Sequence, residues 1–244
     1  TDEYIQSNMT NFNYSLGLNP KVLWHDEKGL QGFIGKFAAQ SSLQMTRKVL
    51  DDQSFAAYNP FALIDDSLLV SSNVYWLNTL YFNRSGNKFG IDYSYLRNFS
   101  KQVITVGPES RGKDEHKITV RYKIAKPVII NGTYSVGNKS LISEGFTSKN
   151  YYIPYKVIEP KITFIKGSVF RTSVYYQYTT SSNNEGGEVL SSNELTFDLR
   201  YNVVAKSTIT TKFSYIAITF DGIEDSPVGY AMLEGLNNGN NILW

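Results

Sequence analysis

The chain of 244 residues contains no cysteine, which excludes disulfides, thiolate metal sites and cysteine nucleophiles. A secreted eukaryotic protein of this size usually carries disulfides, so the lack of cysteine favours a bacterial source. No stretch approaches the roughly 18 consecutive apolar residues of a transmembrane helix, so spanning by helices is excluded. The formal net charge of +2 gives no reason to expect a nucleic-acid partner.

Recognisable catalytic motifs are also missing. The sequence has no nucleophile elbow, no phosphate-binding loop and no paired-histidine motif. Its two histidines, His25 and His116, lie at the ends of predicted strands beside acidic residues, where a solvated turn histidine is expected rather than a metal or acid–base pair. Acidic pairs at 51–52 and 65–66 could bind calcium in an external loop, but they lack the spacing of a calcium loop. We therefore predict no catalytic residue, no metal, no cofactor and no enzymatic activity.

What the sequence does contain is long alternation of apolar and polar residues, best seen between Ser192 and Phe220. One run has Leu195, Phe197, Leu199, Tyr201 and Val203 alternating with Glu194, Thr196, Asp198, Arg200 and Asn202. The next has Ile209, Phe213, Tyr215 and Ala217 alternating with Thr208, Thr210, Lys212 and Ser214. A period of two predicts β-strands with one apolar face. Strands this long are more typical of a bilayer-spanning sheet, which needs about 9 to 11 residues per strand, than of a soluble one.

The rest of the chain repeats this pattern. We predict strands at 10–24, 30–46, 68–82, 89–96, 103–106, 116–125, 128–136, 151–157 and 162–179, the last one a hairpin turning at 166–167. A helix at 38–50 competes with the second strand, because good helix formers cluster there. Residues 51–66 are expected to be a long loop and 108–115 a charged connection, and Pro154 argues against a central strand in a soluble sheet. No helix is secure.

These features predict an all-β, antiparallel transmembrane β-barrel, or part of one, with about 10 to 12 long strands. Tight turns and longer polar loops alternate, as they do in outer-membrane barrels. The alternative is a soluble β-sandwich, but its turn signals would recur every 8 to 12 residues or so, closer together than they are here. Residues 1–244 are predicted to form a single barrel region and to be a fragment of a longer chain.

The two faces of the strands define the candidate functional residues. A cation on the lipid face at the bilayer midplane costs about 2 to 4 kcal/mol, so charged side chains must point into the lumen of a barrel. The predicted lumen-facing row is Glu194, Asp198, Arg200, Lys212, Asp92, Arg121, Lys123 and Arg171. The predicted lipid-facing row is Leu195, Phe197, Leu199, Tyr201, Phe213 and Tyr215.

Several segments also show a family resemblance. They are Leu80-Tyr-Phe-Asn-Arg84 leading into Phe89-Gly-Ile-Asp-Tyr93, Gly107-Pro-Glu-Ser-Arg111, and Tyr230-Ala-Met-Leu-Glu-Gly-Leu236 with Gly239-Asn-Asn-Ile-Leu-Trp244. Together they resemble the C-terminal β-barrel part of large outer-membrane proteins of the Bacteroidetes type, over most of this chain. The resemblance implies that further strands follow Trp244 and that Thr1 lies well inside the parent protein. It implies a location and brings no catalytic residue with it.

The function predicted from the sequence is that of an integral β-barrel protein in the outer membrane of a Gram-negative bacterium, acting in transport, secretion or envelope assembly through a polar lumen. The expected partners are the lipid bilayer and other envelope proteins or other parts of the same chain. The alternative function is a soluble or surface-exposed all-β module that binds glycans or proteins on platforms of tyrosine and tryptophan.

Overall fold

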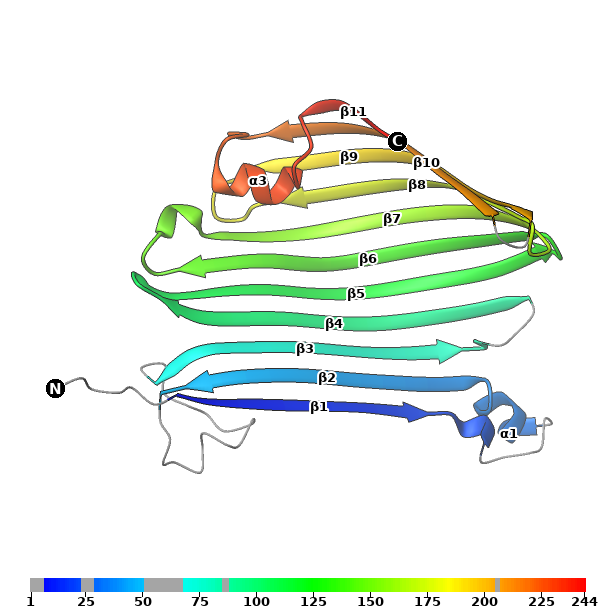
Figure 1. Ribbon diagram of the computed structural model, residues 1–244, viewed down its shortest axis with the longest axis horizontal. Helices are drawn as coiled ribbons and strands as arrows, with labels where there is room; N and C mark the ends of the chain where they lie inside the picture. The colour runs from blue at the N-terminus through cyan, green and yellow to red at the C-terminus, as the bar shows by residue number, and fades with distance from the viewer. Residues whose placement is uncertain (1–6, 23–28, 51–67, 85–87, 205–206) are drawn as a thin grey trace.

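The computed structural model describes residues 7–22, 29–50, 68–84, 88–204 and 207–244. They form one sheet of eleven antiparallel strands, in which the order of strands is the order of the chain (Figure 1). The strands are β1 (Asn8–Leu18), β2 (Phe37–Val49), β3 (Leu69–Phe82), β4 (Phe89–Ile104), β5 (Gly107–Ala125), β6 (Val128–Ser143), β7 (Tyr151–Lys166), β8 (Phe170–Ser182), β9 (Val189–Val204), β10 (Ser207–Asp221) and β11 (Gly239–Leu243). The helices are η1 (Pro20–Val22), α1 (Gly29–Ile34), η2 (Thr147–Lys149) and α3 (Pro227–Leu233). No helix in the described part of the chain is long and apolar enough to cross a membrane.

The all-β antiparallel fold with about 10 to 12 long strands is confirmed, and the described residues form one sheet rather than the two packed sheets of a sandwich. The strands expected at 68–82, 128–136 and 192–220 are present. So is the turn at 166–167, where Gly167 adopts a positive φ of 60° that favours glycine. The helix considered at 38–50 is wrong, because those residues form β2. Helix α1 occupies part of the predicted strand at 30–46, and the strand predicted at 10–24 ends at Leu18.

Strict pairing between neighbours gives the sheet two distinct faces. Ile162, Val174, Phe197 and Phe213 face one another on consecutive strands and form one row across β7 to β10. The next residues along, Thr163, Ser173, Asp198 and Lys212, form a parallel row on the opposite side. Because side chains alternate along a strand, these rows define an apolar face and a polar face that can be followed through the whole sheet.

The predicted charged connection at 108–115 is wrong, since β5 runs unbroken from Gly107 to Ala125. Four of its charged side chains lie on the polar face, where Arg111 lies 2.9 Å from Glu109 and Lys113 lies 3.2 Å from Glu115. The intervening residues Ser110, Gly112 and Asp114 are not apolar either, so this half of the strand shows no apolar alternation in the sequence. The short strand predicted at 103–106 is the end of β4 and the hairpin turn that follows it.

The segments predicted separately at 151–157 and from 162 onward form a single strand, β7, between β6 and β8. Pro154 faces Asn138 and Pro160 faces Gly132, so two prolines lie within the sheet. The β7–β8 ladder has no partners at 159 and 160, yet its register is unchanged between Ile158 and Lys161. A proline lacks only its own N–H group, and here that loss interrupts one ladder without ending the strand.

Turns and loops alternate as predicted over only part of the sheet. Connections at 126–127 and 167–169 are short at one end, and those at 144–150 and 222–238 are longer at the other. The turn at 105–106 breaks the pattern, because it is short and lies at the end where the longer connections lie.

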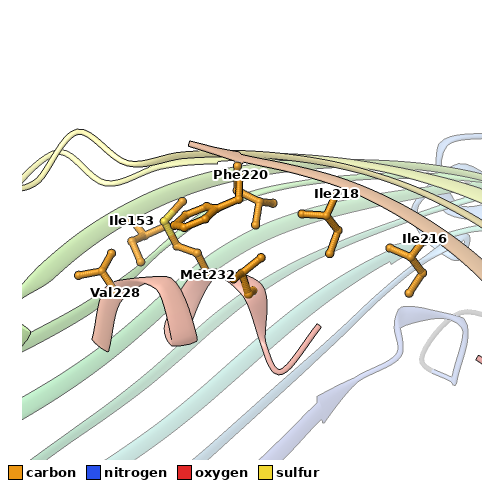
Figure 2. Close-up of a cluster of buried hydrophobic side chains, with 8 residues drawn as sticks. Ile153, Ile216, Ile218, Phe220, Val228 and Met232 are labelled. Carbon is orange, nitrogen blue, oxygen red and sulfur yellow. The ribbon is translucent and has the colours of Figure 1, made fainter. Parts of the chain in front are cut away.

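Helix α3 packs on the polar face and forms the main hydrophobic core. Ser226 caps it by accepting a hydrogen bond of 2.9 Å from the Gly229 amide, and Glu234 ends it in the left-handed conformation. The buried cluster consists of Ile153, Leu190, Ile216, Ile218, Phe220, Val228, Met232 and Leu233 (Figure 2). The helix was not predicted, because seven residues are too few to show a helical period.

Candidate functional site

All eight residues of the predicted polar row lie on the polar face of the sheet. Register places Arg171 opposite Arg200 and Lys212 opposite Asp198, so the structure brings these four together on β8, β9 and β10. Asp92, Arg121 and Lys123 share the face but lie apart from them, on β4 and β5. Glu194 lies nearer α3, where it lines the pocket beneath the helix.

Two of these residues have clear local partners. Arg121 donates hydrogen bonds to the backbone carbonyls of Asn83 and Arg84, at 3.4 and 2.8 Å, and so holds the start of the β3–β4 turn. Glu194 accepts hydrogen bonds from Tyr175 and Thr196, at 3.2 and 2.7 Å.

The predicted apolar row lies together on the other face. Phe213 faces Phe197 and Tyr215 faces Leu195, while Leu199 and Tyr201 continue the same side of β9. The Phe197 and Phe213 side chains are exposed by 41% and 45%.

The most densely bonded part of the polar face surrounds Tyr155. Its hydroxyl donates to a Glu115 carboxylate oxygen at 2.7 Å, reaching from β7 across β6 to β5. Gly137 lies between them, directly opposite both residues. A Cβ at Gly137 would come within 2.8 Å of the tyrosine hydroxyl and 2.3 Å of a backbone oxygen. Glycine therefore leaves the space in which the ring crosses β6.

Cations surround this tyrosine and link it to the helix. Lys113 and Lys139 approach the Tyr155 ring, with nitrogens 5.7 and 5.8 Å from its centre. Lys139 also pairs with Glu234 at the end of α3. These residues line a pocket of about 280 Å³ between helix and sheet, together with Ile216 and Ile218.

We expect Tyr155→Phe to lower the free energy of unfolding by about 1 to 3 kcal/mol, because it leaves the Glu115 carboxylate without its closest hydrogen-bond donor. Denaturant unfolding of the purified protein measures this difference. Tyr215→Phe is the control, since the Tyr215 hydroxyl bonds Asn240 at an exposed position and its loss should cost less than about 0.5 kcal/mol. Equal losses in the two variants would contradict a special role for Tyr155.

Within the described part of the chain, no group of three or more histidine, cysteine, aspartate or glutamate residues is placed to hold a metal. His116 lies on the apolar face, where its Nδ1 is 2.7 Å from the Tyr93 hydroxyl and its ring packs against Tyr95. The other residues considered for metal or acid–base chemistry, His25 and the acidic pairs at 51–52 and 65–66, lie outside the described residues.

No family model matches the chain, and no curated protein matches it. A solved structure that does match is that of OmpT, folded in vitro, an outer membrane protein of Vibrio cholerae in its trimer form. The two chains are 10% identical, with a TM-score of 0.39, and the match covers 88% of this chain and 89% of that one.

The prediction that the chain is not an enzyme does not stand. It rested on missing sequence motifs alone, and a missing motif does not exclude enzymatic activity, so enzyme status is not established.

The Tyr155 cluster was not predicted from the sequence. The tyrosine, the glycine and the glutamate come from three strands, and only the register of two ladders brings them into line. The one available signal was Gly137, a glycine in a run of strand-forming residues, which often marks the close approach of another group.

Proposed function

We propose that this chain forms an integral β-barrel of the bacterial outer membrane, with its apolar face toward lipid and its polar face toward a hydrated interior. The observation that carries the proposal is the exposure of apolar side chains along the whole sheet, from Leu80 on β3 (55% exposed) through Ile162 on β7 (54%) to Ile209 on β10 (52%). Soluble monomers rarely expose a contiguous apolar patch larger than a few hundred Å².

The width of the apolar band supports the same proposal. On β8 the outward side chains are apolar or aromatic from Phe170 to Tyr178, except for Thr172. A stretch of about nine strand residues rises roughly 30 Å, or about 23 Å across the membrane at a tilt near 40°. That is close to the apolar band of roughly 25 Å in outer-membrane barrels.

Aromatic side chains mark the edge of this band nearest α3. Trp76, Tyr95, Tyr134, Tyr178 and Tyr215 lie on the apolar face. Polar groups lie next to these rings on the same face, including Arg97, which faces Trp76, and Asp114, Asn138 and Lys156. Rings with a polar tip concentrate at membrane interfaces, so this row is placed where an aromatic girdle is expected.

Closure of the sheet is part of the proposal. In the described residues β11 pairs with β10 only from Ser214 to Ile218, which leaves the edge of β10 from Ser207 to Phe213 unpaired. Unpaired backbone groups cost several kcal/mol each in hydrocarbon, so an open edge does not persist there. β1, at the other edge of the sheet, runs antiparallel to β10 and so has the direction that a closing ladder requires.

Transport of polar solutes is the role that this arrangement supports best. The polar face carries charges of both signs, and α3 covers one end of it on β7, β9 and β10. A hydrated interior of this kind, narrowed at one end by the helix, would admit polar molecules. Roles in secretion or envelope assembly would use the same interior.

Cysteine labelling tests the proposal directly, because the native chain has no cysteine of its own. Phe197→Cys and Asp198→Cys place a fluorescent label on neighbouring residues of β9 that point to opposite faces. After reconstitution into vesicles, we expect nitroxide-labelled lipids to quench the label at 197 several-fold more strongly than the label at 198, and aqueous iodide to do the reverse.

Equal quenching at the two positions would overturn the membrane proposal. A chain that stays monodisperse without detergent, with both labels open to iodide, would instead indicate the soluble all-β binding module.

A further inference from the structure

We infer that Arg171, Arg200 and Lys212 form a binding site for a phosphate-like oxyanion on the polar face of β8, β9 and β10. The inference rests on the proposed function in one respect, since solutes must reach this face. Arg171 and Arg200 are directly opposite each other in the β8–β9 ladder, and Lys212 lies on the next strand, in the adjacent row of the same face. All three side chains are exposed.

The pairing of two arginines is unfavourable unless an anion joins them. Directly opposed residues in an antiparallel ladder have Cα atoms about 4.5 to 5.5 Å apart, and like charges at that position destabilise a sheet by up to about 1 kcal/mol. In the part of the chain that the structure describes, neither arginine has an ion-pair partner within 4.0 Å. The same holds for Lys212, although it faces Asp198.

Elsewhere on the polar face, charged side chains of β5 form ion pairs with one another. Glu115 lies 3.2 Å from Lys113 and 3.8 Å from Lys117, and Glu109 lies 2.9 Å from Arg111. Among the described residues of β8, β9 and β10, the row next to the arginine pair holds one acid, Asp198, and one cation, Lys212. Three cations therefore share one acid in this region of the face.

Hydroxyl groups lie beside the cations. Thr163 and Ser173 face each other in the row next to the arginine pair, and both are buried, with exposures of 1% and 4%. The Thr163 hydroxyl has no hydrogen-bond partner in the structure. A buried donor without an acceptor costs free energy, which an acceptor oxygen brought by a ligand would recover.

This chemistry fits a tetrahedral oxyanion carrying two charges. A guanidinium group binds two oxygens of a phosphate at once, and an ammonium group adds a point charge without a fixed geometry. Two guanidinium groups and one ammonium can therefore surround a phosphate group, whether it is free inorganic phosphate or part of a larger solute. Rings of arginine and lysine give anion and phosphate pores their selectivity in the same way.

Calorimetric titration of the detergent-solubilised protein with inorganic phosphate, at low ionic strength, tests the site. We expect the dissociation constant to rise at least about tenfold in Arg171→Gln and in Arg200→Gln. Lys117→Gln is the matched control, because it removes one positive charge from the same face on β5, three strands away from β8. Its dissociation constant should stay within about twofold of the native value. Parallel titrations with glucose phosphate and with unphosphorylated glucose distinguish a solute-borne phosphate from the free ion.

A second readout separates binding from a structural role. Without phosphate, Arg171→Gln should raise the temperature at which the protein loses its folded migration in gels, because it removes the repulsion with Arg200. Phosphate should raise this temperature for the native protein and leave the variant unchanged. If Arg171 instead had a structural role, Arg171→Gln would lower this temperature both with and without phosphate.

The inference is overturned if the native protein does not bind phosphate, if Arg171→Gln binds it as tightly as the native protein, or if Lys117→Gln loses binding to the same extent. Lipid quenching of the label at Phe197→Cys, measured on the same preparation, keeps the two proposals apart. Strong quenching without phosphate binding rejects the anion site alone, whereas weak quenching rejects the membrane proposal.

Discussion

Leu80→Arg is expected to lower the free energy of unfolding of the membrane-inserted protein by about 2 to 4 kcal/mol. Leu80 lies on the apolar face, opposite Ala39 and Tyr93, and its side chain is 55% exposed. In water an exposed leucine can be replaced by arginine at a cost within about 0.5 kcal/mol. In a bilayer the guanidinium group must leave water, which costs more. The decrease in the free energy of unfolding therefore shows whether this face contacts lipid or water.

Gln40→Arg is the matched control for this substitution. Gln40 is an exposed residue of the adjacent strand, one position from Ala39 and on the polar face. We expect its free energy of unfolding in vesicles to change by less than about 0.5 kcal/mol. Urea unfolding in lipid vesicles, followed by tryptophan fluorescence, measures both variants, and equal values for the two would mean that the apolar face does not meet lipid.

Met232→Asp is expected to detach α3 from the sheet. The Met232 side chain is 8% exposed within the cluster formed with Ile218 and Phe220 (Figure 2). Burying a carboxylate among apolar side chains with no paired charge costs several kcal/mol, more than a seven-residue helix retains without its packing. Hydrogen exchange of the α3 amides should therefore accelerate by two or more orders of magnitude while β3 to β6 stay protected.

Tyr230→Asp places the same charge on the other side of the helix, where the native side chain is 62% exposed. We expect its α3 amides to exchange within a few-fold of the native rate. If the helix narrows a hydrated interior, Met232→Asp should also raise single-channel conductance in planar bilayers and Tyr230→Asp should not. Loss of protection throughout the sheet in Met232→Asp would show instead that the cluster supports the whole fold.

The side of the strand on which a residue lies could be predicted from the sequence, because residues 194–203 of β9 alternate strictly and a period of two determines which residues share a side. The eight residues of one row therefore share one face of the sheet, and the six residues of the other row share the opposite face. The alternation alone does not determine whether either face contacts water or lipid.

Other parts of the structure could not be predicted from the sequence, for a different reason in each case. The first half of β5 carries polar residues on both faces, so no period was visible. Strand β7 was predicted as two separate segments, 151–157 and from 162 onward, whereas the neighbouring ladders hold it together across Pro160. The arginine pair and the Tyr155 cluster depend on register between strands, which a single sequence does not specify until the turns are known.

The alternation of faces along neighbour-paired strands has a further consequence for assembly. A ladder that slips by one residue during folding turns every side chain of that strand over, so that Asp198 and Arg200 of β9 would face outward together. In a membrane each such charge costs a few kcal/mol, whereas water would tolerate the error. The bilayer would therefore disfavour strands that are paired out of register, and would do so more strongly than water.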